Sequence, residues 1–261
     1  MILTVDIGNT HTTMGLFSDH KLEYDWRTTS GPPKTSDEYG VLVNQFLANA
    51  GSDSGDLKGV IISSVVPPLT DVFSHMSDKY LNQTALIVSN ELEVGVPLSI
   101  DSPEQLGADR ICNAVAGIRK YKLPLVVVDF GTATTFDVIS SQGEYVGGVI
   151  APGVETSAND LFARAAKLPR IDFRFPEKII GKNSVNSMQS GIMRGAVAVV
   201  DYMVTAIEEE LGETVETVST GGFAHLITPY CEKVDKINTH LTLEGLNYIW
   251  HIVNEKSDEE D

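Results

Sequence analysis

Two acidic, glycine-containing turns are the first residues in this sequence whose types and spacing can do chemistry. The stretch TVDIGNTHTT places Asp6 just ahead of Gly8, and the stretch VVDFGTATTF places Asp129 just ahead of Gly131. Glycine lets a backbone approach a ligand closely, and successive amide N–H groups in such a turn form a concave site for anions. A phosphate bound there would bring Mg²⁺, which takes one or two carboxylates as ligands. The turns therefore fit a nucleoside triphosphate site with Asp6 and Asp129 at its edges.

A structural explanation competes with this one, because glycine turns are common and an aspartate often caps the loop backbone beside them. Either turn alone would favour that explanation, since short glycine motifs match frequently by chance. The repetition favours phosphate binding, because two strand ends have no shared structural need for the same acidic turn. No Walker A or Rossmann glycine pattern follows a predicted strand, so neither of those nucleotide sites is indicated. Further hydroxyl donors come from Thr10, Thr12, Thr13 and Thr132.

A second polar cluster, GADRI at residues 107–111, lies within a helix predicted over 102–120. The Asp109 carboxylate could accept the proton of an alcohol, and the Arg110 guanidinium could bind a carboxylate or phosphate through two hydrogen bonds. The pair could equally be a solvated ion pair, as most helix charges are. Gly107 inside a helix costs ~1 kcal/mol relative to alanine and often marks a close approach. The residue types alone leave both interpretations open.

The elements that must position these residues repeat along the chain. Antiparallel strands are predicted over 2–7, 12–17 and 22–28, and again over 125–129, 134–139 and 145–150. Helices and strands then alternate, with helix starts marked by the capping box TSDE at 35–38 and by Ser102 in SPEQ. This repetition predicts two duplicated α/β domains, residues 1–117 and 118–261, each a mixed sheet flanked by helices. We expect the acidic turns to meet across an interdomain cleft.

The composition excludes several classes of partner and site. The chain of 261 residues has a net charge of −17, which disfavours nucleic acid because phosphate backbones attract Lys and Arg. Cys112 and Cys231 are far apart, so neither a disulfide framework nor a zinc site is indicated. No apolar run approaches the ~18–20 residues of a membrane span, and no secretory signal precedes the first strand. We expect a cytoplasmic protein without a membrane partner.

Taken together, the motifs resemble those of the type III pantothenate kinases, which belong to the superfamily of sugar kinases, actin and heat-shock-chaperone ATPases. The resemblance implies two actin-like ATPase domains of ribonuclease H-like fold. It also implies transfer of the γ-phosphoryl group of ATP, with Mg²⁺, to the 4′-hydroxyl of pantothenate, the first step of coenzyme A synthesis. The matching pieces follow the family's order along essentially the whole chain: DIGNT at 6–10, TSDEY at 35–39, SSVVP at 63–67, PEQLGADR at 103–110, DFGTATTFD at 129–137, GGVIAPG at 147–153, MQSGI at 188–192 and TGG at 220–222.

The resemblance also implies roles for individual residues. Asp109 is the expected general base, and Asp129 is expected to hold a monovalent cation, K⁺ or NH₄⁺, in place of the Mg²⁺ considered above. Family members are dimers, so we expect a homodimer to which the apolar helix over 195–204 contributes. The nucleotide site maps onto Asp6, Ile7, Gly8, Asn9, Thr10, His11, Thr12, Thr13 and Thr132, and the substrate site onto Ile100, Gly107, Ala108, Asp109, Arg110 and Ser184.

Three positions depart from the family pattern. Ile100 stands where a tyrosine usually contacts pantothenate, Ser184 replaces a threonine, and His11 replaces an asparagine. The hydroxyl survives at Ser184, and backbone amides bind phosphate at His11, so Ile100 is the departure that bears on substrate identity. The alternatives are a kinase of the same fold for another small alcohol, and a non-catalytic accessory protein for transcription, as some relatives have been described.

Overall fold

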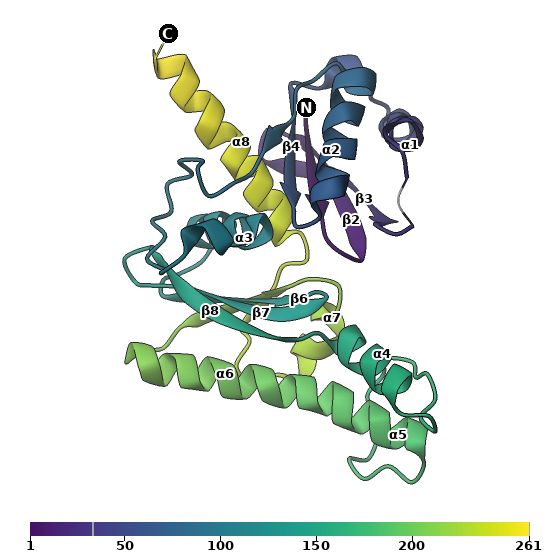
Figure 1. Ribbon diagram of the computed structural model, residues 1–261. Helices are drawn as coiled ribbons and strands as arrows, with labels where there is room; N and C mark the ends of the chain where they lie inside the picture. The colour runs from purple at the N-terminus through teal and green to yellow at the C-terminus, as the bar shows by residue number, and fades with distance from the viewer. Residues whose placement is uncertain (33, 261) are drawn as a thin grey trace. The chain divides into compact units, whose positions relative to one another are not determined.

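The computed structural model describes residues 1–32 and 34–260, with side chains as far as residue 255. The chain divides into two compact units: the first contains Met1–Arg119 and the segment from Leu241 onward, and the second contains Lys120–His240. Figure 1 shows the elements of both units, each of which is described here by itself.

The predicted domain division is corrected for the C-terminal segment, which was expected in the second domain. Helix α8, Leu241–Glu260, packs on the first unit instead. Contact there is so close that a Cβ atom added to Gly245 would lie 2.0 Å from the Cys112 carbonyl oxygen. The Trp250 ring of α8 lies equally close to Gly59, where an added Cβ atom would collide with it. The domain to which α8 belongs is therefore decided by its tertiary packing and not by its position in the sequence.

The sheet of the first unit has the strand order β3-β2-β1-β4-β5. The central strand β1 pairs antiparallel with β2 and parallel with β4, so the sheet is mixed as predicted. The run GVIISS forms the almost wholly buried strand β4, as an apolar segment covered on both faces should. The strands are β1 (Ile2–Ile7), β2 (His11–Ser18), β3 (Lys21–Thr29), β4 (Gly59–Ser64) and β5 (Leu86–Ile87).

Helices cover both faces of this sheet. Successive side chains of β1 point to opposite faces, so Leu3 and Val5 pack with α1 and α2, whereas Ile2 packs with α3 and α8. The same two layers are visible in Figure 1. The helices are α1 (Ser36–Asn49), α2 (Pro67–Met76), α3 (Ala108–Lys120) and α8, with short turns η1 (Ser54–Asp56), η2 (Ser77–Leu81) and η3 (Pro103–Gln105).

Two predicted helix starts have different outcomes. The capping box at Thr35 is confirmed, because its hydroxyl accepts from the Glu38 N–H and the Glu38 carboxylate accepts from the Thr35 N–H. The continuous helix predicted over 102–120 is wrong. The chain forms the 3₁₀ turn η3, becomes extended at Leu106 and starts α3 only at Ala108, and the Ser102 side chain makes no capping hydrogen bond to any described residue.

The second unit repeats the first. Its sheet has the order β10-β9-β6-β7-β8, in which β6 pairs antiparallel with β7 and parallel with β9, just as β1 does with β2 and β4. The duplication predicted from the two turns is therefore confirmed at the level of strand order. The strands are β6 (Leu125–Phe130), β7 (Ala133–Ile139), β8 (Tyr145–Pro152), β9 (Glu216–Thr220) and β10 (Lys236–Ile237).

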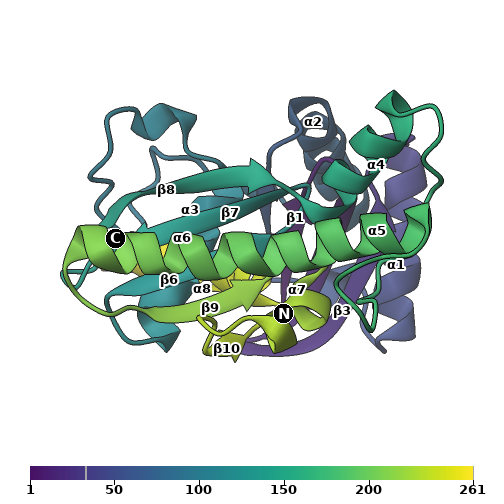
Figure 2. The same ribbon diagram turned by 90° about the horizontal axis from the view of Figure 1, so that it is seen from below.

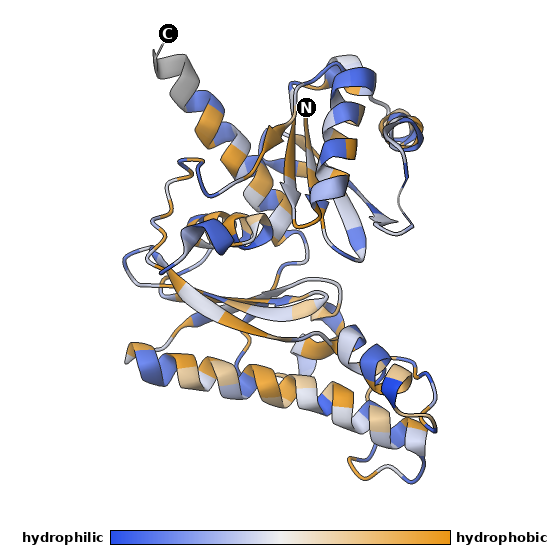
Figure 3. Ribbon diagram, viewed as in Figure 1, coloured by the Kyte–Doolittle hydropathy of each residue, from blue (hydrophilic) through white to orange (hydrophobic). Residues whose placement is uncertain are grey.

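A long helical segment covers one face of the second sheet. Figure 2 shows α6 crossing this sheet, and its buried residues Val200 and Val204 pack against Val126 and Val128 of β6. Figure 3 shows hydrophobic residues along much of α6. The helices of this unit are α4 (Val154–Arg164), α5 (Ser184–Gln189), α6 (Gly195–Leu211) and α7 (Ala224–Ile227), with turns η4 (Ser190–Arg194) and η5 (Thr228–Tyr230).

The segment from α5 through η4 to α6 differs from one sequence-based expectation. By length and composition, the continuous helix Ser184–Leu211 is long and apolar enough to cross a membrane, and it is the one such helix among the described residues. The sequence alone predicts no segment of this kind. A helix that packs on a core passes the same test, so this finding is weak support for a membrane span.

Candidate active site

The first acidic turn connects β1 to β2 and is held by Ser30, the residue that follows β3. The Gly8 N–H donates to the His11 carbonyl oxygen at 3.0 Å, and the Ser30 hydroxyl donates to the Gly8 carbonyl oxygen at 2.6 Å. Because that bond uses the only Ser30 hydroxyl proton, the Thr12 hydroxyl donates to Ser30, 3.1 Å away. Asn9 is exposed at the tip of the turn. The base of the turn is thus fixed while its tip can meet a ligand.

Not every residue of the predicted nucleotide segment has an accessible side chain. Ile7 and Thr12 are buried, and the Thr12 hydroxyl supports the turn from inside. Gly8, His11 and Thr13 are half-buried, and Thr10 is exposed like Asn9. The turn therefore offers a ligand mainly its backbone and the side chains at its tip, which is the arrangement of an anion-binding concavity.

Asp6 lies one residue before the end of β1, half-buried beside the neighbouring parallel strand. The strand register sets Asp6 opposite Ser63 of β4, and the Ser63 hydroxyl donates to Asp6 Oδ1 at 3.0 Å. A carboxylate at the edge of a phosphate-binding turn is the oxygen ligand that Mg²⁺ prefers. The residues of this turn therefore fit Mg·ATP.

An arginine that the sequence analysis missed lies beside the same turn. The Arg27 Nη2 atom is 2.9 Å from His11 Nδ1, and since a guanidinium can only donate, Nδ1 accepts and His11 is neutral in this contact. Arg27 is exposed on β3, opposite Thr13 in the strand register. The predicted meander implies that β2 pairs with β3, and this pairing could have placed Arg27 beside the turn.

The start of α3 places Asp109 and Arg110. The Gly107 carbonyl oxygen accepts from the N–H groups of Arg110 and Ile111 at 3.1 and 3.2 Å, which begins the helix. The Asp109 carboxylate folds back toward Gly107, so that a Cβ atom there would lie 2.4 Å from Asp109 Oδ1. Gly107 therefore precedes the helix and makes room for the carboxylate; the prediction that it lies in mid-helix is wrong. Ala108, the first residue of α3, is buried.

The electrostatics of Asp109 suit a base. Burial raises the pKa of the Asp109 carboxyl above its usual value, although a hydrogen bond from the Arg110 N–H at 2.9 Å and the positive charge of Arg110 act in the opposite direction. A carboxylate with a raised pKa is a stronger proton acceptor than a solvated one. Asp109 thus differs from the solvated ion-pair residue that the sequence alone allowed.

Cys112, to which the sequence assigned no role, is close enough to both Asp109 and Asp6 to feel their charges. Its thiol is fully buried, and burial raises the pKa of Cys112 well above 9.0, helped by the negative charges of Asp6 and Asp109. Residues three apart on a helix share a face, so Cys112 lies on the Asp109 side of α3. The first unit therefore brings the predicted base and the predicted nucleotide carboxylate to the same buried thiol.

The second acidic turn connects β6 to β7 and is tied to the start of α4. The Thr132 carbonyl oxygen accepts from the Gly153 N–H at 3.2 Å and from the Thr156 hydroxyl at 2.6 Å. A Cβ atom on Gly153 would lie 2.4 Å from that oxygen, so glycine is required there. Asp129 is half-buried and Thr132 is exposed, which leaves both able to meet a ligand.

A second glycine determines the surroundings of Asp129. Gly221, in the TGG stretch after β9, has φ +88°, and a Cβ atom there would lie 2.3 Å from Asp129 Oδ1. The backbone of Gly221 therefore abuts the carboxylate. Among the described residues no group of three or more His, Cys, Asp and Glu side chains could hold a metal ion. A cation at Asp129 would accordingly need backbone, hydroxyl or water oxygens as further ligands.

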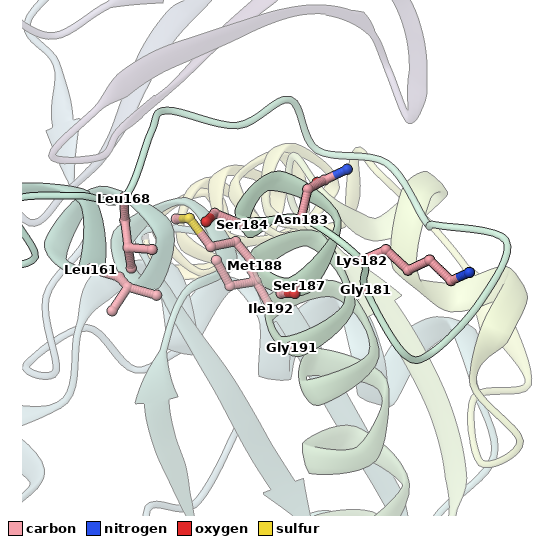
Figure 4. Close-up of a pocket in the computed structure, with 10 residues that line it drawn as sticks. All are labelled: Leu161, Leu168, Gly181, Lys182, Asn183, Ser184, Ser187, Met188, Gly191 and Ile192. Atoms are coloured by element: carbon pink, nitrogen blue, oxygen red, sulfur yellow. The ribbon is translucent and has the colours of Figure 1, made fainter.

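Ser184 lines a pocket of about 610 Å³ within the second unit. It is the first residue of α5, whose N-terminus is capped by Asn183 through a bond of 2.8 Å from the Asn186 N–H. Figure 4 shows Lys182 extending away from the apolar side of the pocket. The remaining lining residues are Leu161, Leu168, Gly181, Ser187, Met188, Gly191 and Ile192. The pocket thus combines the Ser184 and Ser187 hydroxyls with apolar side chains.

The predicted site residues fall into two sets. Ile100 is half-buried in the loop between β5 and η3, and it shares the first unit with the Asp6 turn and Gly107–Arg110. Asp129, Thr132 and Ser184 belong to the second unit.

Comparisons with known proteins agree with the motifs. A family model described as type III pantothenate kinase matches residues 2–206. A curated type III pantothenate kinase from Geobacter sulfurreducens is 45% identical over 250 residues, which cover 96% of this chain and 98% of the relative.

Solved structures show the fold. The crystal structure of a putative Baf family transcriptional activator from Campylobacter jejuni has a TM-score of 0.61 at 18% identity and covers 97% of this chain and 99% of that one. An activator of 2-hydroxyisocaproyl-CoA dehydratase from Clostridium difficile, with bound ADPNP, has a TM-score of 0.56 at 10% identity and covers 100% and 97%. These likenesses, with the repeated strand order, confirm the predicted class of duplicated actin-like ATPase domains.

Proposed function

The chain belongs to the type III pantothenate kinase family, and on that premise we propose that it transfers the γ-phosphoryl group of ATP to the 4′-hydroxyl of pantothenate. The product, 4′-phosphopantothenate, is the first intermediate of coenzyme A synthesis. The observation that carries this proposal is the half-buried Asp109 carboxylate at the start of α3, which shares the Cys112 thiol as a neighbour with Asp6 of the nucleotide turn.

Residues 6–13 bind the phosphates of ATP in this proposal. The turn offers backbone N–H groups at a tip whose base is fixed by Ser30, so little ordering is needed when the anion arrives. Asp6 would hold the Mg²⁺ that accompanies ATP, and the ion would offset the negative charge of the phosphates. Thr132, exposed on the second unit, is a further nucleotide contact.

Asp109 acts as the general base. Its carboxylate accepts the proton of the 4′-hydroxyl while the hydroxyl oxygen forms a bond to the γ-phosphorus. The bond from that phosphorus to the β–γ bridging oxygen breaks, and ADP leaves with the electron pair. The raised pKa of Asp109 increases its proton affinity, and in-line positioning of the two oxygens supplies much of the remaining acceleration.

The substrate is held by Gly107–Arg110, Ser184 and the surroundings of Ile100. The planar Arg110 guanidinium can bind the pantothenate carboxylate through two hydrogen bonds, which a lysine could not do in the same plane. The Ser184 hydroxyl is exposed at the N-terminus of α5 and can bond a polar group of the substrate.

Asp129 holds a monovalent cation, K⁺ or NH₄⁺. Support comes from the half-buried carboxylate and from the backbone of Gly221, which lies against it. A large, weakly charged ion needs several oxygen ligands and tolerates varied geometry, so one carboxylate with backbone and water oxygens is a suitable set.

The protein acts as a cytoplasmic homodimer in this proposal. Support comes from α6, which keeps apolar side chains outside the core of the second unit: Val199 is 36% exposed and Tyr202 is 68% exposed. Such a surface is covered well by a second copy of the same helix.

A second candidate is a kinase of the same fold for another small alcohol, and Ile100 favours it because no hydroxyl is available there. A steady-state assay of ADP formation with ATP, Mg²⁺, K⁺ and pantothenate separates the two. We expect turnover with pantothenate at micromolar to millimolar concentration. No ADP at millimolar pantothenate, together with turnover of another alcohol, would establish the second candidate.

The Asp109→Asn variant tests the base. We expect kcat to fall by about 10²–10⁴-fold while the Kd for Mg·ATP stays within about twofold of the wild type, because asparagine cannot accept the proton. The matched control is Asp101→Asn, which removes an exposed carboxylate from the preceding loop and should leave kcat unchanged. Normal turnover by Asp109→Asn would remove Asp109 from the mechanism.

A further inference from the structure

Ser63 is the buried residue that contacts Asp6 from the neighbouring strand. It has no exposed surface, and its hydroxyl donates to Asp6 Oδ1 at 3.0 Å. A hydrogen bond to a carboxylate is stronger than one between neutral groups, and a buried hydroxyl on a strand has few alternative rotamers. This contact therefore restricts the direction in which the Asp6 carboxylate points.

Ser63 also lies beside the helix that carries Asp109. The Cys112 thiol of α3 is fully buried and neighbours the Ser63 hydroxyl. The single Ser63 proton is donated to Asp6, so this hydroxyl acts on the carboxylate.

The repeated unit places a hydroxyl at the equivalent position. Asp129 of β6 lies opposite Thr220 of β9, as Asp6 of β1 lies opposite Ser63 of β4, and Thr220 is 1% exposed. Ser63 is the one hydroxyl among the buried positions of β4, which is consistent with a role toward the carboxylate, whereas β9 also buries the hydroxyl residues Thr217 and Ser219.

We propose that Ser63 is a positioning residue, which acts through Asp6 to orient the carboxylate for Mg·ATP. The proposal rests on the assignment of Asp6 to the nucleotide site. It adds Ser63 to the residues on which ATP binding depends, as one that acts on the nucleotide through Asp6.

The test is a double-mutant cycle read out as the Kd for Mg·ATP by calorimetry. Ser63→Ala is expected to weaken Mg·ATP binding about 10-fold, because the freed carboxylate loses a charge-assisted hydrogen bond. In the Asp6→Asn background the same substitution is expected to change the Kd by less than about twofold. Ser63→Cys, which keeps the buried volume with a weak donor, should also weaken binding and serves if Ser63→Ala folds poorly.

The matched control is Ser219→Ala, which removes a fully buried hydroxyl of β9 that contacts Thr228 and no acidic turn residue named above. It should leave the Kd unchanged. Wild-type affinity in both Ser63 variants, or an equal loss with and without Asp6, would overturn the proposal. Wild-type protein that binds Mg·ATP but does not phosphorylate pantothenate would refute the proposed substrate and leave the Ser63 cycle valid.

Discussion

The two acidic turns share one backbone plan and differ in what meets the carboxylate. Asp6 is paired with Thr13 on the antiparallel side and Ser63 on the parallel side, and Asp129 is paired with Thr135 and Thr220. Beyond these pairs the units diverge. After Ser63 the chain continues with Ser64, a residue with a side chain, whereas after Thr220 it turns at Gly221 with φ +88°.

This difference bears on the two roles proposed for the turns. In the first unit a side-chain hydroxyl contacts the carboxylate, and α3 adds Asp109 and Cys112 nearby. In the second unit the Gly221 backbone reaches the carboxylate directly, which only a residue without a Cβ atom allows. The proposed Mg²⁺ ligand is thus the carboxylate oriented by a hydroxyl, and the proposed ligand of the monovalent cation is the carboxylate that the backbone approaches.

The largest effect should come from removing the two carboxylates in turn. Asp6→Asn is expected to weaken Mg·ATP binding about 100-fold, because the divalent ion loses its charged ligand. Asp129→Asn is expected to abolish activation by K⁺ and to change the Kd for Mg·ATP far less. Titrations of Mg·ATP and of K⁺ on both variants check this. Identical effects of the two substitutions would break the distinction between the turns.

An intermediate effect on stability should separate Gly221 from an ordinary turn glycine. Gly221→Ala is expected to lower the free energy of unfolding by about 2 kcal/mol more than Gly51→Ala, since alanine at Gly221 would collide with Asp129 Oδ1. Gly51 has φ +74° but no described heavy atom within 4 Å of an added Cβ, so it carries the backbone strain alone. Urea unfolding of both variants gives the difference.

The smallest effect is a shift in pH dependence, which locates the chemistry in the first unit. The acidic limb of the profile of kcat/KM should lie above pH 3.8, the usual pKa of an aspartate, because burial raises the pKa of Asp109. Asp129→Asn should leave this limb in place. A limb that shifts in the Asp129→Asn variant would contradict the assignment of the base to Asp109.

The raised pKa of Asp109 also predicts how the free energy of unfolding depends on pH. A raised pKa means that the folded state prefers protonated Asp109, so its favourable contribution is present below the unfolded pKa and is lost as the pH rises through the folded pKa. At pH 7 the neutral Asp109→Asn variant should therefore be at least as stable as the wild type, with the difference vanishing in acid. Thermal unfolding at several pH values measures it.

Local patterns predicted much of the fold. The capping box at Thr35, the strand meanders and the duplicated turns were all read correctly, because each depends on residues close together in the sequence. The helix over 102–120 failed for a local reason that the pattern did not reveal. The apolar spacing continues through Leu106, but Leu106 is extended and α3 begins only at Ala108. The Asp109 carboxylate occupies the space beside Gly107.

By itself, the sequence determined the two acidic turns, the residue types that suit phosphate and proton transfer, and the family. Only the tertiary structure decided that α8 completes the first unit and that Ser63, 57 residues from Asp6, donates to its carboxylate. It also decided that Asp109 is buried enough for its pKa to rise. Turns and caps follow from short-range backbone preferences, whereas desolvation and contacts between distant residues arise only when the folded chain excludes water.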